Sequence, residues 1–127
     1  MPFLLDTNVI INYLDASLPV SAMQYLHTIV DEAPIISIIT KMEALGYNFK
    51  SADEQKVMET LINASTVLNI SNDVVYKTID IKKTNKIKLP DAIIAASALV
   101  HNLIIISRNT SDFKNIEGLK VIDSYKL

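Results

Sequence analysis

The sequence predicts an α/β domain built on a parallel sheet. Short apolar segments rich in β-branched residues alternate with longer segments whose apolar residues recur at helical spacing. Half of the 127 residues are hydrophobic, which suffices for one domain with a buried core. We expect strands at residues 3–5, 34–39, 66–70, 103–106 and 120–123.

The first half of the chain alternates strands with three helices. Residues 8–14 predict a short helix, and residues 21–33 repeat apolar side chains at the spacing of an amphipathic helix. A third helix is expected to begin at Thr40 and to end or bend at Gly46.

The second half predicts three further helices with recognisable ends. Residues 51–54 form a capping box, and Ser71 is expected to cap a helix that runs to about Asn85. Pro90 suits the first turn of a helix at residues 91–101, and Asn102 suits a left-handed cap after it.

The composition excludes several classes of site. The chain has no cysteine, so disulfides, thiolate nucleophiles and cysteine zinc sites are excluded, and a cytoplasmic location is expected. Two histidines, His27 and His101, are too few and too far apart to favour zinc. No apolar run approaches the roughly 18 residues of a membrane span, and the first residues lack the basic segment of a signal peptide.

The net charge of −2 gives no overall attraction to a polyanion, but the charge is unevenly distributed. Residues 1–60 hold eight acids and three lysines, whereas residues 61–127 hold nine bases and six acids. Five lysines precede Asp91: Lys77, Lys82, Lys83, Lys86 and Lys88. This run is either a solvated helix face or a surface that binds phosphates.

Four acids fall where a parallel sheet forms its sites. Asp6 directly follows the first strand, Glu43 lies one helical turn after the second, and Asp112 follows the fourth. Asp91 begins the helix that leads into the fourth strand. Each acid alone could be a helix cap or turn residue, Glu43 through a capping box with Thr40. Their common edge favours an acidic site, because ligands bind at the carboxyl ends of parallel strands.

Clustered carboxylates without histidine or cysteine are hard oxygen ligands, which suit Mg²⁺ or Mn²⁺. Such carboxylates repel one another unless a cation lies between them. A bound cation can activate water and offset charge on a phosphoryl group. The residues themselves therefore predict metal-assisted phosphate chemistry.

Four motifs, in order along nearly the whole chain, resemble the PIN domain, and within it the VapC toxins of bacterial and archaeal toxin–antitoxin pairs. They are residues 6–10 (DTNVI), Glu43, residues 89–96 (LPDAIIAA) and residues 106–109 (ISRN). The resemblance implies a three-layer α/β/α fold with a five-stranded parallel sheet. It also implies an endoribonuclease that uses Mg²⁺ or Mn²⁺.

The resemblance assigns roles residue by residue. Asp6, Glu43 and Asp91 match the metal-binding acids of the family. Thr7 and Asn8 match polar residues that orient the first acid, and Ser107 matches a hydroxyl beside the site.

The fourth acidic position departs from the family pattern. The family commonly places an acid directly after the arginine of the last motif, where this chain has Asn109. An amide can ligate a metal without adding charge, and Asp112 could supply the carboxylate instead. Both choices stay open, and we expect one well-held ion, with any second ion recruited by RNA.

The implied reaction is in-line attack of an activated water on an RNA phosphodiester, which leaves 5′-phosphate and 3′-hydroxyl ends. Five basic residues are candidates for contacting RNA phosphates: Lys82, Lys83, Lys86, Lys88 and Arg108. The resemblance further implies a homodimer and an antitoxin partner that covers the acidic site.

Three other functions share part of this pattern. An aspartyl-phosphate receiver domain expects adjacent acids after the first strand, but Asp6 stands alone. A haloacid-type phosphatase expects a second aspartate where this chain has Asn8. The third alternative is a catalytically weak PIN fold that binds RNA or protein, and Asn109 is its support.

Overall fold

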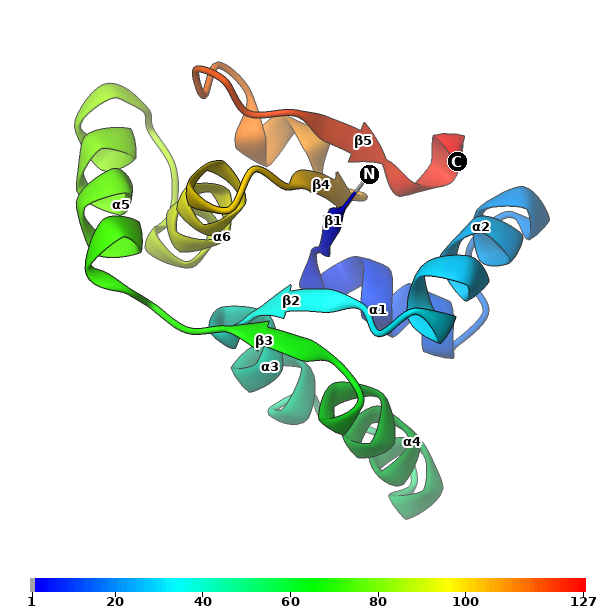
Figure 1. Ribbon diagram of the computed structural model, residues 1–127. Helices are drawn as coiled ribbons and strands as arrows, with labels where there is room; N and C mark the ends of the chain where they lie inside the picture. The colour runs from blue at the N-terminus through cyan, green and yellow to red at the C-terminus, as the bar shows by residue number, and fades with distance from the viewer. Residues whose placement is uncertain (1) are drawn as a thin grey trace.

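Five parallel strands form one sheet in the computed structural model, which describes residues 2–127 (Figure 1). The strands are β1 (Phe3–Leu5), β2 (Ile35–Ser37), β3 (Thr66–Leu68), β4 (Ile104–Ser107) and β5 (Val121–Asp123). Their order in the sheet is β3-β2-β1-β4-β5, and every neighbouring pair is parallel. The predicted three-layer α/β/α architecture is confirmed.

In the described part of the chain, six α-helices and two short 3₁₀ helices surround this sheet. The α-helices are α1 (Thr7–Leu14), α2 (Val20–Asp31), α3 (Ile38–Leu45), α4 (Ala52–Asn63), α5 (Asn72–Thr84) and α6 (Leu89–Val100). The 3₁₀ helices are η1 (Thr110–Phe113) and η2 (Ser124–Lys126). Within residues 2–127, no helix has the length and apolar character needed to cross a membrane.

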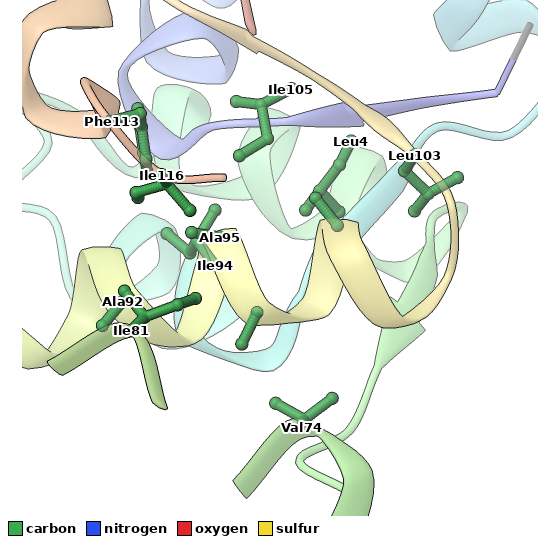
Figure 2. Packing of buried hydrophobic residues seen from close by; sticks show 12 residues of the cluster. Leu4, Val74, Ile81, Ala92, Ile94, Ala95, Leu103, Ile105, Phe113 and Ile116 are labelled. Atoms are coloured by element: carbon green, nitrogen blue, oxygen red, sulfur yellow. The ribbon is translucent and has the colours of Figure 1, made fainter. Parts of the chain in front are cut away.

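Alternation along the strands builds a separate core on each face of the sheet. Leu4 and Ile105 belong to the core under α5 and α6, and Leu5 and Ile106 to the core under α1–α4. Figure 2 shows the first core, where α6 packs small side chains such as Ala95 close to the strands. The central strands are therefore fixed from both sides, and so are the residues that follow them.

The second strand is shorter than the sequence predicts. It ends at Ser37, whose hydroxyl accepts a hydrogen bond from the Ile39 N–H at 3.1 Å and caps α3. Apart from Ser37, the run from Ile35 to Ile39 is apolar, and its isoleucines have no periodicity to mark where strand becomes helix. Thr40 consequently lies inside α3, so the expected capping box with Glu43 is wrong.

The ends of α6 agree with the sequence prediction. Pro90 lies in the first turn of the helix, and Asn102 adopts a left-handed φ of 55° just after it. The helix therefore begins at the carboxyl edge of the sheet and leads back to the start of β4.

The strand order reverses direction between β1 and β4. From β1 the chain continues to β2 and β3 on one side, and then returns to place β4 and β5 on the other. In open parallel sheets this switch point opens a crevice at the carboxyl ends of the two strands. Asp6 and Ser107 lie at those ends.

Candidate active site at the carboxyl edge of the sheet

Asp6 joins the ends of the two central strands. It caps α1, and its Oδ1 accepts a hydrogen bond from the Thr7 N–H at 2.8 Å. Its Oδ2 accepts one from the Ser107 hydroxyl, also at 2.8 Å, and its own N–H donates to the Ile106 carbonyl at 3.0 Å. The residue is only 6% exposed, so the carboxyl group is held in one orientation.

Ser107 connects Asp6 to the turn after β4. The side chain is fully buried, and its oxygen also accepts a hydrogen bond from the Asn109 N–H at 3.0 Å. One hydroxyl therefore fixes both the first acid and the turn that carries Arg108 and Asn109.

Glu43 approaches the same edge through Thr7. The Thr7 hydroxyl donates to Glu43 Oε1 at 2.7 Å, and its oxygen lies within hydrogen-bond distance, 3.1 Å, of the Thr40 hydroxyl. Thr7 and Thr40 are buried, whereas Glu43 is exposed. Thr7 thus bridges the two acids, because its backbone N–H bonds Asp6 and its hydroxyl bonds Glu43.

Asp91 lies in the first turn of α6 and is partly buried. Burial, followed by the charges of Asp6, Asp112 and Glu43, raises the pKa of Asp91 to about 6, while Lys88 acts in the opposite direction. The charge of each of the other three acids therefore acts on Asp91.

The same physics acts on Asp6. Burial raises its pKa, and the charges of Glu43 and Asp112 raise it further. The hydrogen bonds from Ser107 and from the Thr7 backbone lower it, because they stabilise the ionised form. The protein thus holds a carboxylate where both burial and neighbouring charge oppose it, which is typical of functional sites.

The two candidates for the fourth position differ in this structure. Asp112, in η1, is exposed, and its charge acts on both Asp6 and Asp91. Asn109 is exposed too, and its backbone is engaged: its N–H bonds Ser107, and its carbonyl accepts the Asp112 N–H at 3.1 Å. The carboxylate of Asp112 therefore takes part in the electrostatics of the cluster, and Asn109 shapes the turn that presents it.

A model of the PIN domain family matches residues 3–119. The chain belongs to the PIN domain family. The four motifs of the sequence therefore identified the family correctly, and the fold of this PIN domain is shared with proteins of known structure.

Several solved toxin–antitoxin structures have this fold over nearly their whole length. A toxin–antitoxin complex from Klebsiella pneumoniae is 30% identical, with 98% of this chain and 99% of that chain covered and a TM-score of 0.75. DNA-bound VapBC from Salmonella typhimurium is 25% identical, with 98% of each chain covered and a TM-score of 0.81. FitAcB from Neisseria gonorrhoeae, at 22% identity, shares the fold with a TM-score of 0.78 and coverage of 98% and 99%. No curated protein sequence matches the chain.

The donor set of this PIN domain fits a hard divalent cation. Among residues 2–127, no three acidic or histidine side chains gather closely enough to form a ready-made cage for a metal. Mg²⁺ does not require such a cage, because it is commonly bound by one or two carboxylates and keeps several waters. Burial and, after it, the charges of neighbouring acids raise the pKa of Asp6 and of Asp91, and a cation between these acids would relieve the repulsion.

The predicted basic residues fall into different surroundings. Lys88 precedes α6 and its charge acts on Asp91. Lys82 donates from Nζ to the Ile87 carbonyl at 2.5 Å, so it fastens the loop between α5 and α6. Lys83 and Lys86 are exposed, and Arg108 extends toward β5.

Asn8 and three residues that the sequence did not assign to the site lie on elements around the acid cluster. Asn8 is exposed on α1, and its orienting role stays a prediction. The sequence singled out Thr40 only as a helix cap, and it did not single out Asp123 or Tyr125. Thr40 and Glu43, three residues apart, share a face of α3, which was a usable signal. Asp123 and Tyr125 come near the site only through the pairing of β5 with β4.

Proposed function

We propose that this PIN domain is a metal-dependent endoribonuclease, the toxin of a VapBC-type toxin–antitoxin pair. The observation that carries the proposal is the group of four acids at the β1–β4 switch point, Asp6, Glu43, Asp91 and Asp112. Burial and, after it, the charges within this group raise the pKa of Asp6 and Asp91. Such a group at this position suits a divalent cation and a phosphate ester.

Asp6 and Asp91 are the principal ligands in this proposal, because they are the least exposed of the four acids. Ser107 and Thr7 hold Asp6 in its orientation through two 2.8 Å hydrogen bonds. Bound Mg²⁺ or Mn²⁺ would supply the positive charge that activates water and offsets charge developing on the phosphoryl group. Asp112 adds charge at the exposed side, with Asn109 as the neutral alternative ligand.

Glu43 is the candidate for orienting the attacking water and accepting its proton. The Thr7 hydroxyl donates a hydrogen bond to Glu43 Oε1 and so orients the carboxylate. Glu43 is exposed, so its other oxygen, Oε2, is accessible to water. A carboxylate in such a position can act as a general base. In-line attack on an RNA phosphodiester then yields 5′-phosphate and 3′-hydroxyl ends.

An antitoxin is the expected protein partner. The support is that the structures similar to this chain include toxin–antitoxin complexes. A groove of about 400 Å³ lies against α1, α4 and the loop before α4, lined among others by Ile11, Leu14, Tyr47, Phe49 and Val57. Acidic residues outnumber lysine in its lining, with Asp15, Asp53 and Glu54 against Lys50, so it suits an amphipathic segment of positive charge.

A homodimer is also proposed. Helix α5 turns Val74, Thr78 and Ile81 toward the core, yet it exposes a second apolar stripe formed by Val75, Tyr76 and Ile79. Exposed apolar side chains gathered on one helix face favour a protein contact. A cytoplasmic location stays a prediction.

The second candidate function is a PIN fold that binds RNA or protein without useful catalysis. The uncharged Asn109 favours it, since one fewer charge weakens metal binding. The electrostatic participation of Asp112 weighs against it.

The deciding experiment incubates purified protein with a structured RNA in Mg²⁺, in Mn²⁺ or in EDTA. We expect cleavage with either metal and none in EDTA, with 5′-phosphate ends on the products. The Asp91→Asn variant, purified in parallel, controls for contaminating nuclease. RNA binding without metal-dependent cleavage would favour the second candidate.

The number of ions is tested separately by calorimetric titration of RNA-free protein with Mn²⁺. We expect one tight site, because Asn109, which occupies the fourth acidic position of the family directly after Arg108, carries no charge. Two tight sites would contradict this hypothesis.

A further inference from the structure

Arg108 is a cation held in a defined position beside the acid cluster. It directly follows Ser107, whose hydroxyl contacts Asp6 Oδ2 at 2.8 Å. Its side chain extends to the end of β5, where a guanidinium nitrogen lies 3.8 Å from Asp123 Oδ2. The guanidinium carbon also lies 4.0 Å from the centre of the Tyr125 ring. The arginine is therefore held by a charge and by an aromatic face at once.

The strand register determines where these partners lie. Asp123, the last residue of β5, pairs with Ser107, the last residue of β4. Asp123 Oδ1 accepts a hydrogen bond from the Tyr125 N–H at 2.9 Å, and Ser124 between them is fully buried. The backbone that carries the Tyr125 ring is thus anchored to the end of β5.

The guanidinium keeps its capacity to bind another anion. The 3.8 Å separation from Asp123 is longer than a hydrogen bond, so this contact orients the group without using up its N–H donors. The side chain is 46% exposed. Stacking on a ring engages the flat face of a guanidinium and leaves its N–H edge free, which is the edge that matches a phosphate in two-point contact.

An RNA strand at this edge needs such a cation. The four carboxylates of the cluster and every phosphate of the strand are negative, and one divalent ion cannot balance them all. Adjacent strands lie about 4.8 Å apart, so the end of β5 is about 10 Å from the end of β1. Arg108 itself follows β4, the strand beside β1, so its long side chain spans the region in which a phosphate next to the one over Asp6 would lie.

We propose that Arg108, stacked on Tyr125 and tethered to Asp123, is the binding subsite for an RNA phosphate adjacent to the phosphate that is cleaved. The proposal rests on the proposed cleavage of RNA at the acid cluster. Arg108 contacts the substrate in this scheme, and Asp123 and Tyr125 are positioning residues that hold it.

Binding is measured with a fluorescent single-stranded RNA in the Asp91→Asn background, so that the readout does not depend on cleavage. Adding Arg108→Gln should weaken binding about tenfold and reduce the slope of log Kd against log salt by about one. The matched control is Lys56→Gln, which removes the same charge from exposed α4 beside β3, at the opposite end of the sheet (Figure 1). This control should change Kd by less than about twofold.

Positioning is tested at Tyr125. Tyr125→Leu should weaken RNA binding about threefold, whereas Tyr125→Phe, which keeps the ring face, should bind as the parent does. In the cleaving protein, Arg108→Gln should raise KM about tenfold and leave kcat within about threefold. Melting temperatures of all variants show whether a loss of binding accompanies a loss of fold.

The proposal is overturned if Arg108→Gln changes Kd no more than Lys56→Gln. It is also overturned if Tyr125→Leu lowers the melting temperature and leaves RNA binding unchanged, since the stack would then be structural only. Failure of the proposed function has a different signature, because the wild-type protein would not cleave RNA in Mg²⁺ whatever the binding assays report.

Discussion

The carboxyl and amino ends of the central strands β1 and β4 carry different kinds of side chain, although each strand is only three or four residues long. At the carboxyl end, β1 leads into buried Asp6 and β4 ends in buried Ser107. At the amino end, Phe3 and Ile35 line a groove of about 460 Å³ together with Tyr25 of α2. Phe3 and Tyr25 pack edge to face there, with ring centres 6.0 Å apart.

The direction of the chain accounts for this difference. Helices α1, α3 and α6 begin at the carboxyl edge, so their N-terminal N–H groups and the positive ends of their dipoles point toward the acids. Strand β2 begins at the amino edge, where α2 has just ended. A groove thus lies at the amino edge, but buried Asp6 and partly buried Asp91, both with a raised pKa, favour the opposite edge as the functional one.

The largest expected effect comes from removing charge at the carboxyl edge. Asp6→Asn and Asp91→Asn should each lower RNA cleavage by at least about 10³-fold, because each removes a proposed metal ligand. Initial rates in Mg²⁺ and melting temperatures measure activity and fold. Glu32→Gln, at an acid that lines the amino-edge groove, is the matched control and should keep full activity. Undiminished cleavage by both aspartate variants would refute the site.

A smaller effect is expected from the residue that orients the first acid. Ser107→Ala deletes the hydrogen bond to Asp6 Oδ2 and should lower activity about 10- to 100-fold, as is common for groups that support metal ligands. The hydrogen bond lowers the pKa of Asp6, so its loss should move the acidic limb of the pH–rate profile to higher pH. A variant with the rate and pH profile of the wild type would show that Ser107 only fills space.

The stability of the metal-free protein should depend on pH through Asp91. Its pKa is about 6 in the folded protein against an ordinary 3.8, so its protonation favours the folded state. That contribution is complete below pH 3.8 and is lost as pH rises through 6. Asp91→Asn cannot ionise there. In EDTA, its free energy of unfolding should exceed that of the wild type by an amount that grows by about 1–2 kcal/mol between pH 4 and 7.

The control for this measurement is Asp53→Asn in the first turn of α4. It makes the same chemical change at an exposed acid that complements the helix dipole, so it should destabilise the protein slightly. Urea unfolding across the pH range gives both differences. If the free energy of unfolding of Asp91→Asn does not rise relative to the wild type between pH 4 and 7, ionised Asp91 does not destabilise the metal-free protein. Mg²⁺ at pH 7.5 should stabilise the wild type and not Asp91→Asn.

The sequence predicted the family and the strand–helix order because local patterns determine them. Pro90 and Asn102 act through their own backbone preferences, and both agree with the structure. The bond between Asp6 and Ser107 spans 101 positions and depends on β4 lying beside β1, which no local pattern specifies. The cap of α3 was predicted three residues late for a different reason, because Ser37, which caps the helix through the Ile39 N–H, stands between isoleucines that fit a strand equally well.

The fourth acid shows where sequence reasoning stopped short. Asn109 and Asp112 are three residues apart, and both belong to one turn after β4. Whether a side chain in a turn faces the cluster depends on the backbone path, here a 3₁₀ turn that begins after Asn109. The electrostatic coupling of Asp112 to Asp6 and Asp91 follows from that path.

The smallest effect is expected at the amino edge. Tyr25→Leu removes the edge-to-face contact with Phe3, which is worth about 0.5–1.5 kcal/mol, and should lower the melting temperature by about 3 °C. Cleavage of RNA and its salt dependence should stay at wild-type values, because Tyr25 lies at the opposite end of the strands from Asp6. Thermal unfolding and initial rates measured on one preparation test both. A loss of activity larger than the loss of stability would mean that the two edges are coupled through β1, and that the amino-edge groove takes part in function.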